Sequence, residues 1–364
     1  MKKILSLLLI LICLITLTSC LDFLSINSDD ANNIDILNPE NTQKVLLFIG
    51  DGMGENHIRT AEIHLGKKMI FSTFEKQGYV KTNSLTPLVP TDSAAAATAL
   101  ATGQKTFNGS VATRLGNNLT SISELAKENG LGVGIVTTDT LSGATPAGFS
   151  GHASNRSDEE NIIKSQLDNK FDLYLGSGYD SYVKYKGDFI NAGYDFIDDY
   201  NNLKLTSKKV IGTFNSISNY TPSDKNPTLP ILTEYAVKYM EQNFPNGYFL
   251  MIEGAHIDKM SHNNDVFKMI NYLDEFNNSI NTAKTMLKNN DDYCLIVTAD
   301  HETGGLILPI NKEEISNNLY TKDSHTSQNV KYYVYTESNI DLSVIIETID
   351  NTDIFKTCKK ILKI

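Results

Sequence analysis

The chain has 364 residues, of which 41% are hydrophobic, enough to bury one large core with or without a small subdomain. Its formal net charge of -11 at pH 7 excludes a basic surface of the kind that binds nucleic acid. The sequence contains no internal repeats.

Residues 1–20 are predicted to be an export signal. Lys2 and Lys3 precede an apolar run at 4–17 that is too short to span a membrane comfortably. The run ends at Thr18-Ser19-Cys20, which resembles the processing site of bacterial lipoproteins, where the cysteine is lipidated. The alternatives are an ordinary signal peptide cut nearby or an uncleaved anchor. We therefore expect an exported protein, membrane-anchored through Cys20 on the periplasmic or cell-surface side.

Residues 21–43 are rich in Asn, Asp and Ser and predict a flexible tether, which leaves 44–364 as a single domain. Two of the four cysteines, Cys13 and Cys20, belong to the signal. The other two, Cys294 and Cys358, could pair in an oxidising compartment. Cys294 lies in an apolar run, so we favour a buried core residue over a disulfide.

The domain begins with a continuous apolar run at 45–49, typical of a buried parallel strand, followed by Gly50-Asp51-Gly52-Met53-Gly54. Glu55 stands where a dinucleotide loop needs its third glycine, which excludes that motif. Asp51 either shapes the turn or acts as a ligand at the carboxyl end of the strand. In the helix predicted after it, His57 and His64 indicate a packed or solvated face more than a metal pair.

Residues 91–103 predict a helix with marked ends, because a polar start precedes an Ala-rich body and a glycine. Ser93 would lie at its N-terminus, where unpaired N–H groups and the helix dipole favour an anion. By itself Ser93 is more typical of a helix cap than of a nucleophile aimed at a phosphate.

The rest of the chain alternates between strand and helix patterns. Helices are expected at 121–129, 159–167, 233–243 and about 259–288 and at the C-terminus, with strands at 132–136, 171–175, 248–252, 293–298 and 330–335, a long connection at 138–156 and a mixed segment at 179–226. This order predicts an α/β fold: a three-layer α/β/α arrangement with a central, largely parallel β-sheet.

Acidic residues and histidines gather where the predicted strands end. They are Asp51, Glu253, Asp258, His262, Asp300, His301 and His325. Because parallel strands end at one edge of a sheet, we expect these side chains to meet. Mixed Asp and His ligands suit zinc, and oxygen-only sets suit magnesium. Carboxylates crowded without cations would repel, so bound metal is the simplest interpretation.

These motifs resemble the alkaline phosphatase family over residues 44 to about 340. The matching segments are 49–54, 91–99, Ala144-Thr145-Pro146-Ala147, Glu253-Gly254-Ala255 with Ile257-Asp258-Lys259, Thr298-Ala299-Asp300-His301, and His325-Thr326. They occur in the family's order, and together they are far more specific than any one of them.

The resemblance implies two zinc ions and one magnesium ion per chain. Its zinc ligands would be Asp258, His262 and His325 for one ion, and Asp51, Asp300, His301 and the Ser93 oxygen for the other. Its magnesium ligands would be Asp51, Thr145 and Glu253. The implied reaction is hydrolysis of small phosphate monoesters to an alcohol and inorganic phosphate, with Ser93 as nucleophile through a phosphoserine intermediate and Arg156 gripping the phosphate. Homodimers are usual in that family, and no nucleic acid is involved.

Five residues in or beside the motifs stand out. Gly143 occupies a position that commonly carries Asp or His beside the magnesium, which weakens that site. Lys259 is present, but the acid it would pair with at that position is missing, so it is free to approach the phosphate. Asp92 is expected to orient Arg156. His152 is expected either to contact residues that hold the ligands or to pack, and the role of His256 is open. Short spacings between motifs indicate a compact member of the family.

Two alternatives are weighed against a monoesterase. A phosphodiesterase or sulfatase of the same superfamily is disfavoured, because sulfatases need a different sequence after the nucleophile and diesterases lack the arginine. A zinc- or phosphate-binding surface lipoprotein without turnover would need one broken catalytic element. Ser93, Arg156 and both zinc sets are intact in this sequence.

Overall fold

The computed structural model describes residues 44–364, apart from 219–220, 289, 291 and 338–346. The described residues belong to one compact unit that ends at Ile364. The predicted export signal, the lipidated Cys20 and the tether lie outside the described residues. No helix among the described residues is long and apolar enough to span a membrane.

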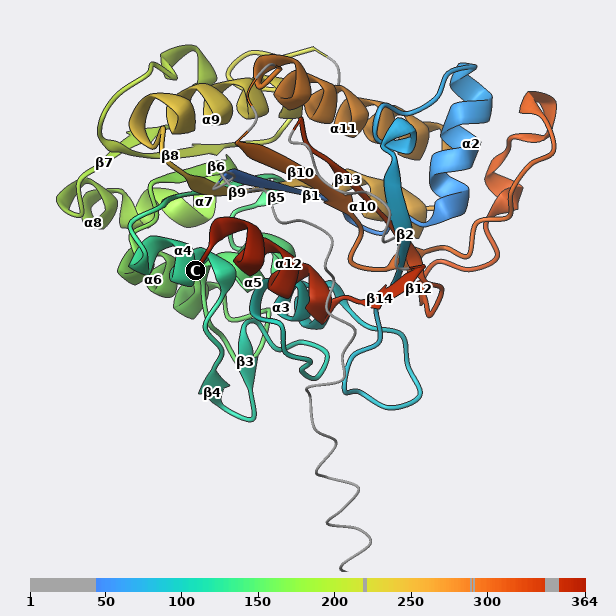
Figure 1. Ribbon diagram of the computed structural model, residues 1–364, viewed down its shortest axis with the longest axis horizontal. Helices are drawn as coiled ribbons and strands as arrows, with labels where there is room; N and C mark the ends of the chain where they lie inside the picture. The colour runs from blue at the N-terminus through green and yellow to red at the C-terminus, as the bar shows by residue number, and fades with distance from the viewer. Residues whose placement is uncertain (1–43, 219–220, 289, 291, 338–346) are drawn as a thin grey trace, which may run out of the picture. The chain divides into compact units, whose positions relative to one another are not determined.

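A ten-stranded sheet forms the centre of the fold (Figure 1). Every strand in it runs parallel to its neighbours except β13, which pairs antiparallel with β10 and β2. The strand order is β14 (Thr348–Asp350), β2 (Lys76–Lys81), β13 (Val330–Tyr335), β10 (Tyr293–Thr298), β1 (Lys44–Gly50), β9 (Tyr248–Gly254), β5 (Gly132–Thr140), β6 (Leu173–Ser177), β8 (Lys209–Phe214) and β7 (Tyr194–Ile197). The predicted largely parallel sheet is confirmed.

Helices cover both faces of the sheet, which confirms the predicted three layers (Figure 1). One face carries α9 (Leu229–Asn243) and α11 (Val266–Met286), with α2 (Glu55–Leu65) packed against α11. The other face carries α3 (Ser93–Thr102), α4 (Ile122–Glu128), α5 (Ala144–Ser150), α6 (Glu159–Asn169) and α12 (Thr352–Leu362). Because both faces are covered, every residue of β1 and β9 is buried, as their continuous apolar sequences require.

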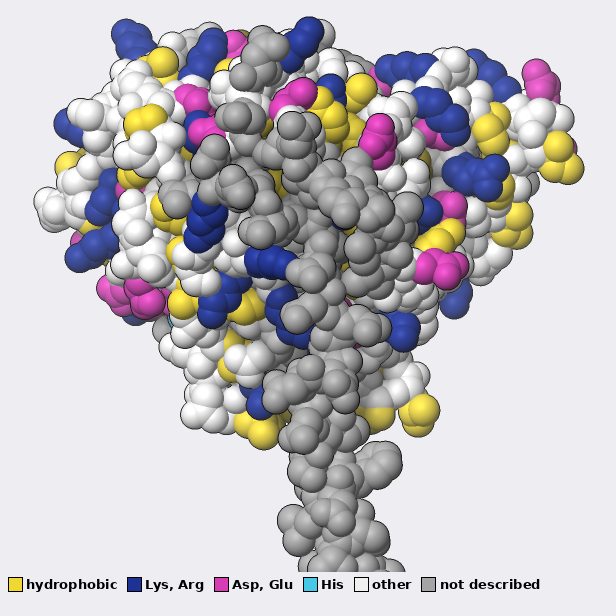
Figure 2. Space-filling model, in the orientation of Figure 1, with side chains coloured by type: hydrophobic (Ala, Val, Ile, Leu, Met, Phe, Trp, Pro, Cys, Tyr) yellow, Lys and Arg dark blue, Asp and Glu magenta, His cyan; other side chains and the backbone are white. Residues whose placement is uncertain are grey.

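Shorter elements complete the described fold. They are α7 (Tyr179–Tyr182), α8 (Lys186–Asn191), α10 (His256–His262), the pair β3 (Thr113–Arg114) and β4 (Asn117–Asn118), and the pair β11 (Glu302–Thr303) and β12 (His325–Thr326). On the face drawn in Figure 2, Lys and Arg side chains are scattered among Asp and Glu.

Two sequence predictions of local structure are wrong. The single helix expected at 259–288 is divided into α10 and α11, because Asn264 adopts a left-handed φ of 52° and Asp265 caps a new helix through the Lys268 N–H. The connection expected at 138–156 contains regular structure: β5 continues to Thr140, and α5 occupies 144–150. Strands β2, β7, β8 and β14 were not predicted.

Helices α3 and α5 lie unusually close together. All ten residues of α3 are buried, and their small alanine side chains allow α5 to approach. A Cβ atom added at Gly148 would lie only 2.8 Å from the Cβ of Ala97. The Ala-rich sequence therefore packs Ser93 and Thr145, which begin or nearly begin these helices, on the same side of the sheet.

Cys294 and Cys358 are both buried and free. The interpretation of Cys294 as a core residue is confirmed, and the two thiols form no disulfide in this structure.

Candidate metal centre

Three adjacent parallel strands deliver acidic residues to one edge of the sheet. In the register of β10, β1 and β9, Ile49 lies level with both Thr298 and Glu253. Asp51 comes two residues after Ile49, and Asp300 comes two residues after Thr298. Both therefore lie just beyond the carboxyl ends of their strands. Open α/β sheets place ligands at this edge.

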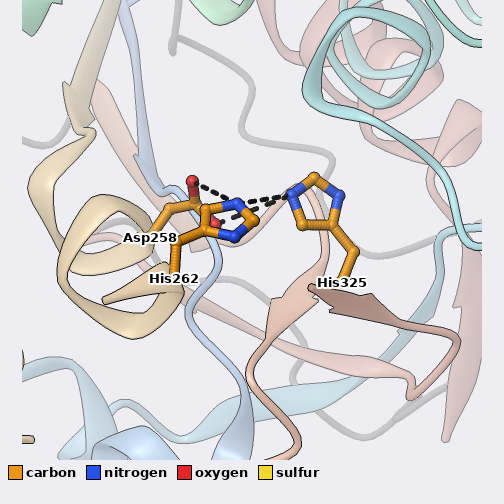
Figure 3. Close-up of side chains that lie close together, drawn as sticks. All are labelled: Asp258, His262 and His325. Atoms are coloured by element: carbon orange, nitrogen blue, oxygen red, sulfur yellow. Dashed lines mark hydrogen bonds and ion pairs between the residues drawn. The ribbon is translucent and has the colours of Figure 1, made fainter. Parts of the chain in front are cut away.

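Asp258, His262 and His325 form the first group of potential ligands (Figure 3). Asp258 and His262 lie one turn apart on α10, and His325 reaches them from β12. The Nε2 atom of His262 lies 3.3 Å from Asp258 Oδ2 and 3.1 Å from His325 Nε2, and His325 Nε2 lies 3.7 Å from Asp258 Oδ1. Two imidazole nitrogens and a carboxylate thus converge on one point.

Backbone carbonyls orient both histidine rings of this group. The Nδ1–H of His262 donates to Asp323 O at 2.5 Å, and that of His325 donates to Thr91 O at 2.8 Å. The Nε2 atoms of both rings are thereby turned inward, toward Asp258. On the opposite side the Thr303 hydroxyl donates to Asp258 Oδ1. Such outer contacts fix the orientation of metal ligands.

Asp51, Asp300 and His301 form the second group, and all three are buried. His301 Nε2 lies 3.1 Å from Asp300 Oδ2, 3.5 Å from Asp51 Oδ1 and 3.1 Å from Ser93 Oγ. The backbone N–H groups of Gly52 and His301 donate to Asp300 Oδ1 at 3.1 and 2.9 Å. The other oxygen of Asp300 therefore points toward His301.

The electrostatics of these groups fit divalent cations. Burial raises the pKa of Asp51 well above its ordinary value, and the Asp300, Asp258 and Glu253 carboxylates raise it further. Burial lowers the pKa of His301, which leaves its ring in the neutral form that binds metals. Asp51 Oδ1 and Asp300 Oδ2 are buried and accept no hydrogen bond from the described residues. Buried oxygens and repelling carboxylates are stabilised when a cation lies between them.

Ser93 is the first residue of α3, and its cap is the residue before it. Asp92 Oδ1 accepts the Ala95 N–H at 3.0 Å, so the capping role that the sequence favoured for Ser93 belongs to Asp92. The Ser93 hydroxyl faces His301 and the second group instead. It lies at the end of a helix where N–H groups favour anions.

Asp92 also holds Arg156, as predicted. Asp92 Oδ2 lies 3.2 Å from Arg156 Nη1 and accepts the Gly109 N–H at 2.9 Å, and the Arg156 N–H donates to Gly109 O at 2.7 Å. The Arg156 side chain is 40% exposed. One carboxylate thus links the start of α3 to an arginine at the rim of the centre.

Glu253, at the end of β9, lies beside the hydroxyls of Thr137 and Thr145. Its side chain is buried, and burial raises its pKa to about 8, with a further contribution from the charge of Asp139. Asp51 comes from the adjacent strand β1, two residues after Ile49, which is level with Glu253, and the Glu253 charge helps to raise the pKa of Asp51. The three residues expected at the magnesium site are therefore neighbours at this edge.

The expectation that Lys259 lacks an acidic partner is wrong. Its Nζ donates to Asp139 Oδ1, and the side chains of the pair are 42% and 25% exposed. Although burial lowers it, Asp139, Glu253 and Asp51 hold the pKa of Lys259 above its ordinary value. Asp139 comes from the end of β5, four residues before Gly143, whereas from the sequence we expect the partner at position 143.

The remaining histidines lie outside both groups. His57 is buried and bonds Ser261 Oγ at 3.1 Å, and His64 packs against Phe267, so the pair is a packed face as expected. His152 bonds Glu124 Oε1 at 2.8 Å and Ala112 O at 2.9 Å, which confirms its packing role. His256 stacks on Tyr272 with ring centroids 4.7 Å apart.

Comparison with known proteins identifies relatives of this chain. The alkaline phosphatase family model matches residues 42–354. Alkaline phosphatases 3 and 4 of Bacillus subtilis are 31% and 32% identical to it over 74% and 75% of this chain, which spans 63% and 64% of their lengths. The alkaline phosphatase structure from the Antarctic bacterium TAB5 is 27% identical and covers 88% of this chain and 99% of its own, with a TM-score of 0.78. A variant of that enzyme has Mg bound in its M3 site and matches with a TM-score of 0.76 at 26% identity.

The fold and the two ligand groups define a metal-binding protein of the alkaline phosphatase fold. The chain belongs to the alkaline phosphatase family, as the resemblance of its motifs predicted. It spans just under two thirds of the length of the Bacillus relatives it matches.

Proposed function

We propose that this protein is an alkaline phosphatase that hydrolyses phosphate monoesters through a phosphoserine on Ser93. The observation that carries the proposal is the position of the Ser93 hydroxyl. It lies at the start of α3 and 3.1 Å from His301 Nε2, in contact with the buried Asp51, Asp300 and His301 group. A serine that served only as a helix cap would have no reason to face these residues.

Three cation sites are part of the proposal. Asp258, His262 and His325 would hold one zinc, and Asp51, Asp300 and His301, with the Ser93 oxygen, would hold the second. Asp51, Thr145 and Glu253 would hold magnesium. When bound, these cations supply the positive charge that lowers the pKa of a serine hydroxyl and offsets the charge of a phosphate.

The chain's own residues account for binding and attack. The Ser93 oxygen attacks phosphorus, the alcohol leaves, and water then releases inorganic phosphate from the phosphoserine. The N–H groups at the start of α3 and the Arg156 guanidinium bind the non-bridging oxygens. Asp92 restrains both, because it caps the helix and contacts the guanidinium.

The position of Arg156 favours monoesters over diesters. The side chain is 40% exposed, but Asp92 contacts its guanidinium and the Gly109 carbonyl accepts its backbone N–H, so the remaining guanidinium N–H groups can face a terminal phosphate. A diester has one charge fewer for such a fork to bind. A phosphodiesterase of the same superfamily and a non-catalytic binding protein stay as alternatives for the experiment to separate.

The proposal extends to location and assembly on sequence grounds. The apolar run at 4–17 and the following cysteine support an exported lipoprotein, membrane-anchored through Cys20 on the periplasmic or cell-surface side. We also propose the homodimer that is usual in the family. Labelling with a fatty-acid analogue, lost on Cys20→Ser, and the mass in solution would test these two statements.

The central test compares nitrophenyl phosphate with bis-nitrophenyl phosphate as substrates of the full chain in mild detergent. We expect faster turnover of the monoester at alkaline pH, loss of activity with a chelator, and recovery with zinc. Faster turnover of the diester would establish the phosphodiesterase. A zinc-loaded protein that binds phosphate without turning over either substrate would establish the binding protein.

A further inference from the structure

Gly143 leaves a space that another side chain fills. A Cβ atom built on Gly143 would lie 2.7 Å from Asp139 Oδ2 and 3.1 Å from Asp139 Cγ. Both distances are too short for ordinary contact. Any side chain at position 143 would therefore start inside the volume that the Asp139 carboxylate occupies.

Asp139 is connected through both its carboxylate and its backbone. Its Oδ1 accepts from Lys259 Nζ, on α10 beside Asp258. Its own backbone N–H donates to Thr137 Oγ1 at 2.8 Å, and the same hydroxyl donates to Glu253 Oε2. One hydroxyl thus joins Asp139 to Glu253.

The carboxylate of Asp139 and the charged groups around it form a set that suits a cation site. Asp139 and Asp51 both act on Lys259, and Asp139 acts directly on Glu253, so the three carboxylates share one electrostatic environment. Only one ammonium group, that of Lys259, is paired with them among the described residues. When the three carboxylates are ionised, as cation binding requires, the set carries a net negative charge, and oxygen ligands of this kind suit magnesium.

We propose that Asp139 takes the place of the missing side chain at position 143 and completes the magnesium site of Asp51, Thr145 and Glu253. The carboxylate comes from four residues earlier in the chain, at the end of β5, and reaches the same volume. It is a positioning residue: it adds negative charge beside the cation and holds Lys259 at the edge of the site. Gly143 is required because a side chain there would displace it.

This inference rests on the cation site included in the proposed function, and its test measures binding rather than turnover. Magnesium chloride is titrated into the zinc-loaded full chain in an isothermal calorimeter. We expect Asp139→Asn to weaken magnesium binding about 10–100-fold, as changes beside metal ligands do, with zinc content and thermal midpoint unchanged. Asp195→Asn is the matched control. Asp195 lies on the remote strand β7 and also pairs with a lysine, since Lys208 Nζ lies 2.9 Å from its Oδ1.

A second variant tests whether positions 139 and 143 share one volume. Asp139→Ala should bind magnesium as weakly as Asp139→Asn, and Asp139→Ala/Gly143→Asp should regain most of the lost affinity. Asp139→Ala/Gly143→Ala controls for the Thr140 carbonyl, which lies 2.9 Å from the same Cβ position. A double variant with an unchanged thermal midpoint but no regained affinity would overturn the shared volume.

Two results would overturn the inference without touching the proposed hydrolysis through Ser93. One is wild-type magnesium affinity in Asp139→Asn. The other is a zinc-loaded wild type that takes up no magnesium although the same sample hydrolyses nitrophenyl phosphate. If the zinc-loaded wild type binds magnesium normally but does not hydrolyse nitrophenyl phosphate, the result would count against the proposed function and leave the role of Asp139 in place.

Discussion

The carboxylate of Asp92 joins the start of helix α3 to Arg156. One of its oxygens accepts the Ala95 N–H at 3.0 Å, and the other lies 3.2 Å from Arg156 Nη1. The capping bond is local and the contact with the arginine spans 64 residues of sequence. A single side chain therefore has two roles that substitutions can separate.

Replacing Asp92 should separate these roles. Asp92→Asn keeps a good helix cap but removes the charge that holds Arg156, so we expect a nearly unchanged thermal midpoint and weaker inhibition by inorganic phosphate. Asp92→Ala removes both and should also cost about 1 kcal/mol of stability. Thermal unfolding and phosphate inhibition constants check both variants. Equal phosphate inhibition in wild type and Asp92→Asn would show that Arg156 does not depend on this contact.

Ser93→Ala should remove turnover and spare the fold. Asp92 caps the helix, and alanine has the highest helix propensity, so stability should change by less than about 0.5 kcal/mol. The Asp and His ligands remain, so zinc content should stay close to that of the wild type. Nitrophenyl phosphate hydrolysis and elemental analysis give the two readings, with the exposed Ser157→Ala as control. Undiminished turnover in Ser93→Ala would rule out Ser93 as the nucleophile.

Cation binding should release protons at neutral pH. Burial raises the pKa of Glu253 to about 8, and the hydrogen bond to Asp258 raises that of His262 to about 9, so in the metal-free protein both groups carry protons at pH 7. Metal ligation requires the deprotonated forms. Calorimetric titration of the metal-free chain with zinc and magnesium, in buffers of different ionisation enthalpy, counts the protons. The same binding heat in every buffer would contradict this expectation.

The His152–Glu124 pair should stabilise the fold within a limited pH range. Against the effect of burial, Glu124 raises the pKa of His152 above 6.5, and His152 lowers that of Glu124 below 4.5. The histidine contribution is therefore complete below pH 6.5 and lost as pH rises through its raised pKa. The glutamate contribution is present above pH 4.5 and lost as pH falls through its lowered pKa.

Glu124→Gln tests this range, because glutamine can keep the capping box with Ser121 while losing the charge. The difference in free energy of unfolding between wild type and variant, measured in urea from pH 3 to pH 10, should be largest between the two pKa values. It should shrink toward both ends of the range. A difference that is independent of pH would show that the pair contributes only through packing.

Much of the site could be read from sequence because its residues follow apolar runs. Asp51, Glu253 and Asp300 end buried strands that are parallel and adjacent, so their meeting follows from the fold class. The register of β1 against β9 and β10 then fixes which residues are level. No knowledge of side-chain packing was needed for this part.

The residues that surround the ligands were harder to predict. Asp139 pairs with Lys259 across 120 residues, and Thr303 bonds Asp258 across 45. Neither partner has a residue type or a spacing that marks it. A signal for Asp139 was present, since it lies at the end of the same kind of apolar strand as the ligands, but the sequence predicts an end at residue 136, four residues before β5 ends. Because the predicted strand ends before Asp139, this acid is missing from the predicted site.

The prediction of local structure failed where single residues outweigh the hydrophobic periodicity of the sequence. The apolar pattern continues from α10 into α11, yet the left-handed turn at Asn264 divides them, and this turn lets α10 present Asp258 and His262 to the centre. Strand β14, at the edge of the sheet, and its neighbour β2 have short, partly exposed sequences, so the pattern of a buried strand is absent. Their position depends on pairing that only the fold supplies.

The place of β1 in the sheet has a consequence for biosynthesis. This first described strand is fully buried between β9 and β10, which follow it by about 200 residues in the chain. Until both partners have been made, its apolar residues and both rows of backbone hydrogen-bonding groups face solvent. Such an unpaired strand is an aggregation hazard. A nascent or truncated chain that stops before Thr298 should therefore need a chaperone to stay soluble.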